Sequence, residues 1–361
     1  MAFQLKAKEP VRDGILRNVR AQIEKAIIHI GALNSAKAKP HSAGANRKPQ
    51  TAEGAENEAV HEVRKCFKRV RAALRLVRED LGDDFYHEEN WSIRDAARPL
   101  NLIRDADVLI QTADNLSQQF PCAVEPGAFA KIHEALVRNR ETVICRVLNA
   151  QKAAAVAHDA ASRALARLPD WQIAREGWAA LEAGLRRVYR TGHRALALAA
   201  ETSSMENLHE VRKQAKYLWH QLQLVEGVWT GTGKELIDQT HKLSTLLGED
   251  HDLAVLRQTL AADPLSFGGH RVLKAVFAVI DGRREELEKE AFALGFEIYD
   301  DPSKIFITRI RAALSYGEKP GGGPNEEGQP DEGPAEGTEP GPAIEGRHRQ
   351  GQTPSARKSR S

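Results

Sequence analysis

The stretch from Val60 to Leu81 carries a row of basic side chains at helical spacing. This cationic stripe consists of His61, Arg64, Lys68, Arg71, Arg75 and Arg78. Its members are three or four residues apart, so on an α-helix they share one face and follow one another at about 5 Å along the axis. No acid is interleaved, and a row of like charges destabilises an isolated helix. The pattern therefore predicts that an anion binds along the stripe.

The residue types of the cationic stripe suit phosphate in particular. The planar guanidinium of arginine can donate two parallel hydrogen bonds to one phosphate group, and the ammonium of lysine acts as a point charge. A linear polyanion also matches a linear row of cations. The alternative interpretation is a solvated helix face, which is the usual reason for a run of charges. The lack of interleaved acids favours the anion site.

An apolar stripe accompanies the cationic one and indicates how this helix packs. It consists of Val60, Val63, Phe67, Val70, Leu74, Val77 and Leu81. Alternating steps of three and four residues make one continuous buried face on an α-helix. Because one residue corresponds to about 100° of rotation, the cations lie along the flank of that buried face.

The same pattern recurs later in the chain, where His209-Glu-Val-Arg-Lys213 repeats His61-Glu-Val-Arg-Lys65. The second apolar stripe is Leu208, Val211, Ala215, Leu218, Leu222 and Val225, and its basic companions are His209, Arg212 and Lys216. The chain is therefore internally duplicated, with one such helix in each half. The second cationic stripe is shorter, because Trp219, Gln223 and Glu226 stand where the first has Arg71, Arg75 and Arg78.

Composition bounds the class of protein. The chain has 361 residues, 41% of them hydrophobic, and a formal net charge of only +2, so any anion site must come from local segregation of charge. No apolar run approaches the roughly 18 residues of a membrane span, and no signal-peptide core stands near the N-terminus. The three cysteines, Cys66, Cys122 and Cys145, cannot all pair. We therefore expect reduced thiols and a cytoplasmic protein without membrane contact.

Every periodic segment is helical, and none alternates with period two as a strand would. Besides the two duplicated helices, we expect helices over residues 11–33, 91–116, 129–168 (as one helix or a pair), 171–202, 231–260, 270–296 and 301–314. Pro99 should break or kink its segment. Residues 34–57, rich in Ala, Gly, Pro, Ser and Lys, predict a flexible loop.

The C-terminal segment from residue 317 has the composition of a disordered tail. Eight acids and one base lie between Gly317 and Glu345, whereas Gly346–Ser361 holds five bases and no acid. Such Gly-, Pro- and charge-rich blocks cannot bury a core. We therefore expect a first helical bundle over residues 11–168, a second over 169–316, and a disordered acidic-then-basic tail over 317–361.

Two His-x-x-Arg-Lys-x-x-Lys helices, each followed by an Arg-Asp or His-Asp element, resemble the CHAD family, the conserved histidine α-helical domain. The second elements of the two halves begin at Arg104-Asp105 and His251-Asp252. Further segments that carry the resemblance are 184–195, 246–256 and 293–310, and the likeness extends over roughly residues 11–314.

The resemblance implies an all-α fold of two four-helix bundles related by a pseudo-twofold axis. It also implies a basic central cavity that binds inorganic polyphosphate, without a cofactor, and a location in the cytoplasm at polyphosphate granules. Some family members carry a CYTH triphosphatase domain, which would need a β-barrel and an Glu-x-Glu-x-Lys stretch. Neither is present in this sequence, so we expect a stand-alone, non-catalytic protein.

The candidate polyphosphate-binding residues come from both helices and from the basic segment that precedes the second. They are His61, Arg64, Lys65, Lys68, Arg71, Arg75, Arg187, Arg190, His209, Arg212, Lys213 and Lys216. Of these, Arg64, Lys68, Arg71, Arg75, Arg212 and Lys216 are expected to contact phosphate directly. The two histidines are interpreted as phosphate-contacting donors or as structural groups bonded to a neighbouring loop.

Metal chemistry is an alternative for the histidines. Zinc needs three or four convergent ligands, and the cationic neighbours of His61 and His209 would repel it. A metal-dependent phosphohydrolase of the HD type could use His241, His251, Asp252 and Asp281. The equivalent pair in the first half is Arg104-Asp105, which suits an ion-paired structural element and argues against a ligand pair.

Nucleic acid is a further alternative, as a competing polyanion. The basic helices lack the interleaved aromatic residues of a base-stacking platform. They also show no helix-turn-helix signature with its glycine turn. Tyr217 and Trp219 form an aromatic pair in the second copy, for which a packing role is expected.

Overall fold

The computed structural model describes residues 2–37, 50–146, 153–229 and 233–314. Within these ranges the regular structure is helical, and β-type pairing is limited to an isolated bridge between Trp229 and Leu314. The predicted all-α fold is thus confirmed for the described part of the chain. The predicted disordered tail lies outside the described residues.

The helices follow the predicted segments closely. The α-helices are α1 (Val11–Lys37), α2 (Gln50–Leu76), α3 (Arg78–Leu81), α4 (Asp83–Gln119), α5 (Ala128–Ile144), α6 (Ala153–Arg167), α7 (Trp178–Glu201), α8 (Met205–Val225), α9 (Gly233–Ala262), α10 (His270–Ile298) and α11 (Ser303–Ala313). Short 3₁₀ turns are η2 (Leu168–Asp170), η3 (Glu226–Val228) and η4 (Pro264–Phe267). No described helix is long and apolar enough to cross a membrane.

Some boundaries differ from the prediction; α7, for example, begins at Trp178 and not at residue 171, and α4 begins at Asp83 and not at residue 91. Helices occupy both ends of the loop expected over residues 34–57, because α1 ends at Lys37 and α2 already begins at Gln50. Residues 38–49 lie outside the described part. Pro99 was expected to break or kink its segment, and the helix is not broken there, since α4 is one helix from Asp83 to Gln119.

Burial on both sides of Pro99 explains why α4 continues through it. Ile93, Ala96, Leu100 and Ile103 are all buried. A proline inside a helix costs about 3 kcal/mol, whereas burying one large aliphatic side chain stabilises the fold by roughly 1.5–3 kcal/mol. The aliphatic residues on either side of the proline therefore offset its cost, which a local propensity rule does not take into account.

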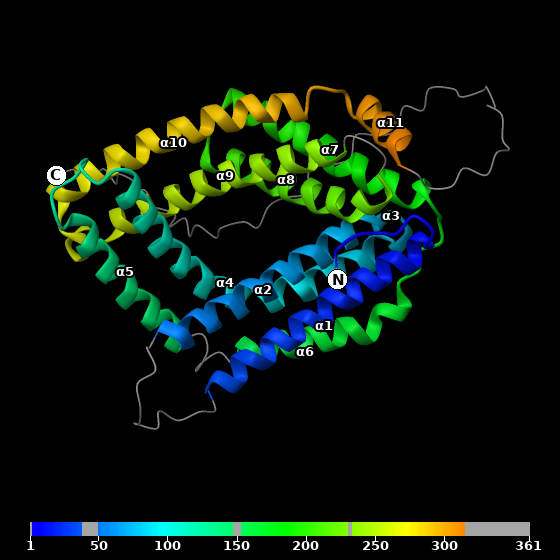
Figure 1. The fold of residues 1–361 in the computed structure, drawn as a ribbon, viewed down its shortest axis with the longest axis horizontal. Coiled ribbons are helices and arrows are strands. Elements are labelled where there is room, and N and C mark those ends of the chain that lie inside the picture. The colour runs from blue at the N-terminus through cyan, green and yellow to red at the C-terminus, as the bar shows by residue number, and fades with distance from the viewer. Residues whose placement is uncertain (1, 38–49, 147–152, 230–232, 315–361) are drawn as a thin grey trace, which may run out of the picture. The chain divides into compact units, whose positions relative to one another are not determined.

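The helices pack as two groups that meet in the middle of the unit Met1–Gly317 (Figure 1). In the first group α1 packs on α2 and α6, and α4 packs on α2, α5 and α6. In the second group α8 lies between α7 and α9, α10 packs on α9, and α11 packs on α7. The groups touch where α2 contacts α7 and α8 and where α4 contacts α9. The division into separate domains at residue 168 stays a prediction, because these contacts join the two groups.

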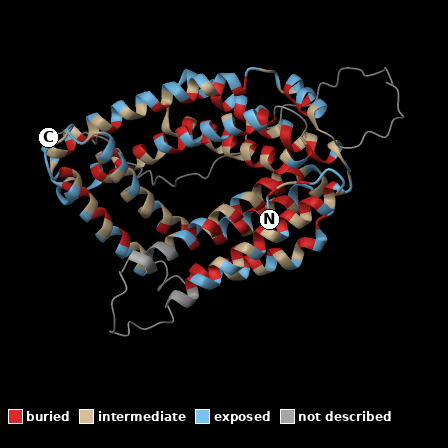
Figure 2. Cartoon of the chain, in the orientation of Figure 1, coloured by how far each residue is buried: buried red, intermediate tan, exposed pale blue. Residues whose placement is uncertain are grey.

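The apolar stripes of α2 and α8 form the core as predicted. The core includes Val63, Val70 and Leu74 on α2 and Leu218 and Leu222 on α8, each of them 0% exposed. Figure 2 shows that buried positions recur along both helices. Because the stripes anchor these faces in the core, the basic flank of each helix has a defined direction.

A local signal determines where α8 begins. Ser204 is its N-cap, with extended backbone, and its hydroxyl accepts a hydrogen bond of 3.1 Å from the backbone N–H of Asn207. Such a cap stabilises a helix start by about 1 kcal/mol. The cap therefore favours a helix start at Met205.

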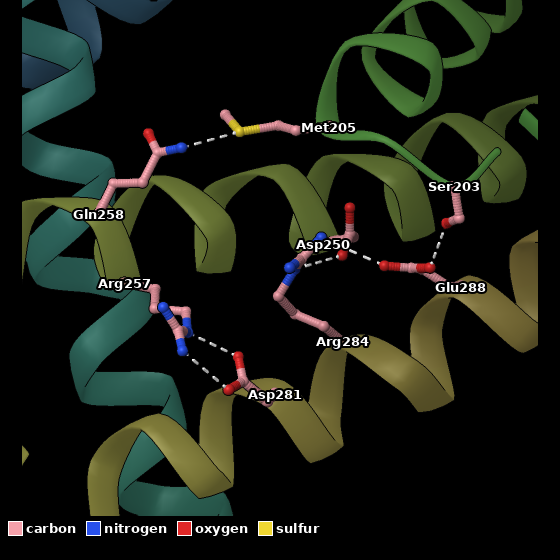
Figure 3. A network of polar contacts seen from close by, with 8 residues as sticks. All are labelled: Ser203, Met205, Asp250, Arg257, Gln258, Asp281, Arg284 and Glu288. Atoms are coloured by element: carbon pink, nitrogen blue, oxygen red, sulfur yellow. Dashed lines mark hydrogen bonds and ion pairs between the residues drawn. The ribbon is translucent and has the colours of Figure 1, made fainter. Parts of the chain in front are cut away.

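A polar network fastens α9 to α10 (Figure 3). Arg284 Nε donates to Asp250 Oδ1 at 2.8 Å and Arg284 Nη2 donates to Glu288 Oε1 at 3.2 Å. The hydroxyl of Ser203, just before α8, donates to Glu288 Oε2 at 2.6 Å. Asp250 is only 3% exposed, and burial raises its pKa although Arg284 opposes that effect. The network holds the turn of α9 that carries His251 and Asp252.

Candidate anion-binding site

A cavity of about 520 Å³ lies between α2, α4, α8 and α9. We call it the cationic cavity. Its walls are His61, Arg64, Lys65 and Lys68 from α2; Arg104, Asp105, Val108 and Leu109 from α4; Arg212, Lys216, Trp219 and His220 from α8; and His241, His251, Asp252 and Val255 from α9. The volume falls within the roughly 300–1,000 Å³ typical of ligand sites.

Positive charge dominates the cationic cavity. Arg64, Lys65, Lys68, Arg104, Arg212 and Lys216 supply the cations, and Asp105 and Asp252 are the lining carboxylates. The apolar stripes position these groups, because the basic flank of α2 faces that of α8 when both helices bury their stripes. The arrangement attracts an anion.

Most of the cavity cations have no acidic partner within the described part of the chain. Arg64 Nη2 lies 4.0 Å from Asp105 Oδ1, and Arg64 also donates to Asn101 Oδ1. Lys65 pairs with Glu62 at 3.2 Å. The remaining cations, Lys68, Arg104, Arg212 and Lys216, form no ion pair or hydrogen bond with another described residue.

The ammonium groups are held close to other cations. Burial lowers the pKa of Lys68 to about 7, and Arg64, Lys216 and Arg212 add to that effect by repulsion. The side chain is open to solvent on the cavity side, so water screens part of this repulsion. Burial likewise lowers the pKa of Lys216 to about 8, with a further contribution from Arg212. A bound anion would therefore stabilise the charged form of both ammonium groups.

The carboxylates are shifted in the opposite sense. Burial raises the pKa of Asp105, and the cations of Arg64 and Lys68 oppose that rise. Burial also raises the pKa of Asp252, while Arg212 and Arg104 oppose it and Asp105 adds to it. Burial therefore disfavours the charged form of both acids, and the neighbouring cations oppose that effect.

Histidine side chains also line the cationic cavity, and burial is the main reason that the pKa of each is lowered. The pKa of His251 falls to about 4 and that of His220 to about 3, while those of His61 and His241 are lowered as well. The pKa of His209 is lowered too, and for both His61 and His209 burial contributes more than the neighbouring cations. These rings are neutral near pH 7 and can donate hydrogen bonds to an anion.

Two buried nitrogens beside the cavity have no hydrogen-bond partner among the described residues: Arg212 Nε and His251 Nδ1. Buried polar groups are nearly always satisfied by protein, water or ligand. A Cβ at Gly248 would lie 3.5 Å from Arg212 Nε, so α9 approaches this guanidinium closely with glycine at that position. The unmet donors are consistent with a site that is completed by a ligand.

The structure brings six of the predicted residues into the cationic cavity, namely His61, Arg64, Lys65, Lys68, Arg212 and Lys216. His209 lies next to it, with its ring centroid 5.0 Å from that of His251. Sequence reasoning missed Arg104 and His251 as lining residues. They begin the second element of each half, and Arg104 was expected to be ion-paired there. In the structure its neighbour Asp105 pairs with Arg64.

Arg71 and Arg75 do not line the cavity and lie one and two turns further along α2. Arg71 Nε donates to Asn90 Oδ1 at 2.9 Å. Arg75 donates to the same oxygen at 3.4 Å and to the Arg71 carbonyl oxygen at 3.1 Å, and its guanidinium lies 3.9 Å from the centre of the Tyr217 ring. These contacts hold the two guanidinium groups but leave their remaining donors available.

The other predicted residues lie elsewhere on the surface. Arg187 on α7 pairs with Glu79, and Lys213 on α8 pairs with Glu210. Arg190 is exposed on α7 and does not line the cavity. The role of all three in binding stays a prediction.

The residues of the metallohydrolase alternative do not converge. His241, His251 and Asp252 line the cavity, but Asp281 is engaged by Arg257, whose Nε and Nη2 donate to its two carboxylate oxygens at 2.7 and 3.2 Å (Figure 3). Among the described residues, no group of three or more His, Cys, Asp or Glu side chains has the arrangement of a metal site.

The fold and the site together define an all-helical protein with a cation-lined cavity between its two groups of helices. The chain matches the family model of the CHAD domain over residues 42–261, which is more than half of its length. It therefore belongs to the CHAD family.

Among solved structures, the chain is similar to the crystal structure of the CHAD domain from the plant Ricinus communis. The two share 17% sequence identity at a TM-score of 0.47, over 88% of this chain and 96% of the plant chain. No curated protein matches the chain.

Proposed function

We propose that this protein binds inorganic polyphosphate in the cationic cavity and does so without catalysing a reaction. The observation that carries the proposal is the set of four cations, Lys68, Arg104, Arg212 and Lys216, that line one cavity from three helices and have no acidic partner among the described residues. Cations that are partly removed from water normally have an acidic partner. A phosphate chain would supply the missing negative charge to all four together.

The contacts follow from the donor types. Arg64, Arg104 and Arg212 present planar forks for the phosphate oxygens, while Lys68 and Lys216 contribute point charges. The neutral imidazoles of His61 and His251 donate one hydrogen bond each. Outside the cavity, Arg71 and Arg75 continue the stripe on α2, and a longer chain would reach them next. A polyphosphate ligand would also place the protein in the cytoplasm at polyphosphate granules.

Binding should depend strongly on salt. Each lysine or arginine contact with a polyanion releases condensed counterions, so affinity for long-chain polyphosphate should fall at least tenfold between about 50 and 200 mM salt. Titration calorimetry at the two salt concentrations measures this. Pyrophosphate should bind more weakly because it reaches fewer cations, and single-stranded DNA should bind more weakly because its charges are more widely spaced.

Matched variants locate the site. Lys68→Gln should weaken polyphosphate binding about tenfold, since a charge-assisted contact contributes about 1.5–3 kcal/mol. Arg194→Gln removes an exposed cation of α7 that does not line the cavity, and it should bind as the wild type does. A response that is flat in salt, or equal losses in both variants, would contradict the proposal. Phosphate release on incubation with Mg²⁺ or Mn²⁺ would contradict its non-catalytic part.

A further inference from the structure

A second cavity, of about 420 Å³, lies beside the cationic cavity between α4 and α9. Arg104, Val108 and Asp252 line both, so the two spaces adjoin at these residues. We call the second space the amide chamber. Its other walls are Gln111, Thr112, Asn115, Leu116 and Gln119 from α4, Thr245, Glu249 and Leu253 from α9, and Arg283 and Leu287 from α10.

The amide chamber carries balanced charge, in contrast to its neighbour. Its arginines, Arg104 and Arg283, are matched by Glu249 and Asp252. Arg283 is moreover paired, with Glu249 at 3.7 Å and with Glu286 at 2.9 Å. A phosphate chain that continued from the cationic cavity into this space would lose its counter-charges. The amide chamber is therefore not an extension of the polyphosphate path.

Besides these charged groups, the amide chamber has neutral carboxamides. Gln111, Asn115 and Gln119 lie four residues apart on one face of α4, and none forms a side-chain hydrogen bond with a described residue. Each carboxamide offers both donors and an acceptor. Thr245 donates its hydroxyl hydrogen to the His241 carbonyl at 3.0 Å, which leaves its oxygen as an acceptor.

Aliphatic side chains form the remaining surface of the amide chamber: Val108, Leu116, Leu253 and Leu287. Only these four of the thirteen lining residues are aliphatic, so the amide chamber has a largely polar wall with an aliphatic patch. A polyol would leave the aliphatic wall without a partner. A flat heterocycle would cover that wall and present donors and acceptors at its edge to the carboxamides.

We propose that the two cavities together take a nucleoside polyphosphate, with the phosphates in the cationic cavity and the nucleoside in the amide chamber. The shared residues, Arg104 and Asp252, stand where the two parts of the ligand join. Arg104 can donate hydrogen bonds to the first phosphate, while the Asp252 carboxylate can accept a hydrogen bond from a ribose hydroxyl. This inference rests on the proposed function for the phosphate part of the ligand only.

The test compares adenosine 5′-tetraphosphate with inorganic tetraphosphate by titration calorimetry on the full chain. The nucleotide carries one negative charge fewer at full ionisation, so charge alone predicts that it binds more weakly. We expect it to bind at least fivefold more tightly. The double variant Gln111→Ala/Asn115→Ala should lose that advantage and keep the wild-type affinity for inorganic tetraphosphate. Circular dichroism checks that the helices are retained, which alanine favours.

The control variant is Gln118→Ala, which removes an exposed carboxamide from the same helix that does not line either cavity. It should keep the full advantage of the nucleotide. Equal affinity for the two ligands, or an advantage that survives in the double variant, would overturn the inference and leave the proposed function intact. Failure of both ligands to bind would instead contradict the anion site itself.

Discussion

The environment of Lys68 in the cationic cavity disfavours the charged form of its side chain. Burial and the neighbouring cations Arg64, Lys216 and Arg212 all act against its ammonium, so that its pKa is about 7. An unperturbed lysine has a pKa near 10.4. A phosphate chain would reverse the sign of the local field and favour the charged form. Ligand binding and proton uptake are therefore linked at this residue.

The linkage predicts how affinity changes with pH. In the free protein the pKa of Lys68 is about 7 and that of Lys216 about 8, and bound polyphosphate should raise both. Below pH 7 both groups are already charged without ligand, so their contribution to affinity is complete. As the pH rises from 7 to 9, the free protein loses protons that the complex keeps. Affinity for long-chain polyphosphate should then fall at least tenfold, as calorimetry at constant ionic strength can measure.

Substitution by arginine provides the control for this pH effect. Arginine stays charged throughout the range, so Lys68→Arg should retain binding at pH 9 and flatten the profile. His220 and His251 do not contribute above pH 7, because their pKa values are about 3 and 4. A wild-type profile that is already flat from pH 7 to 9 would show that these ammonium groups do not contact the ligand.

Trp219 explains part of the difference between the two copies. It occupies the position that corresponds to Arg71 on α2. Its ring lines the cationic cavity, with its centre 4.7 Å from the Lys216 ammonium and 4.2 Å from the centre of the His241 ring, to which it is tilted by 38°. An indole attracts a cation electrostatically. The second copy thus holds its lysine in place with an aromatic ring instead of adding another charge.

At the scale of the helices, the approach of α7 to the end of α2 decides how the two groups of helices join. Gly184 on α7 meets the carbonyl of Leu76, the last residue of α2. A Cβ built on Gly184 would lie 2.1 Å from the Leu76 oxygen and 2.6 Å from its carbonyl carbon. No side chain can be accommodated there unless the two helix backbones separate.

Gly184→Ala should therefore destabilise the protein by about 1–3 kcal/mol, as overpacking in a close-packed interior does. Urea denaturation followed by circular dichroism measures the change. Gly282→Ala on α10 is the matched control, since a Cβ there meets no atom within 4 Å, and the better helix propensity of alanine should stabilise by up to about 1 kcal/mol. If both variants shift the midpoint in the same direction, the close contact at Leu76 does not limit packing.

At the scale of the whole molecule, the cationic cavity belongs to neither group of helices alone. Lys68 and Arg104 come from the first group and Arg212 and Lys216 from the second. A ligand that binds all four must hold the groups together. Anything that binds only the folded state stabilises it, by about 2.7 kcal/mol at a ligand concentration of 100 times Kd.

Polyphosphate should consequently raise the melting temperature of the protein by a few degrees, in one cooperative transition. Lys68→Gln and Lys216→Gln, one from each group, should each reduce the rise, whereas Arg194→Gln should not. Differential scanning calorimetry with and without saturating ligand provides the measurement. Two separate transitions, with the ligand shifting only one, would mean that the two groups of helices fold and bind independently.

The sequence by itself determined the helices and their buried faces. Periodicity is a local property, so the apolar stripe of α2 predicted correctly that Val63, Val70 and Leu74 are buried. It also predicted that a row of cations runs beside them. A break at Pro99, one of the two outcomes expected there, does not occur, because the offsetting burial of Leu100 and Ile103 comes from neighbouring helices.

Only the tertiary structure decided which cations share a cavity. Lys68 and Arg71 belong to one stripe, yet Lys68 faces α8 and α9 across open space while Arg71 meets the amide oxygen of Asn90. Arg104 was expected to be ion-paired and instead lines the cavity without a partner among the described residues. Helical spacing specifies the direction of a side chain from its own axis. What stands opposite, whether an amide, a carboxylate or a cavity, depends on how distant segments of the chain pack.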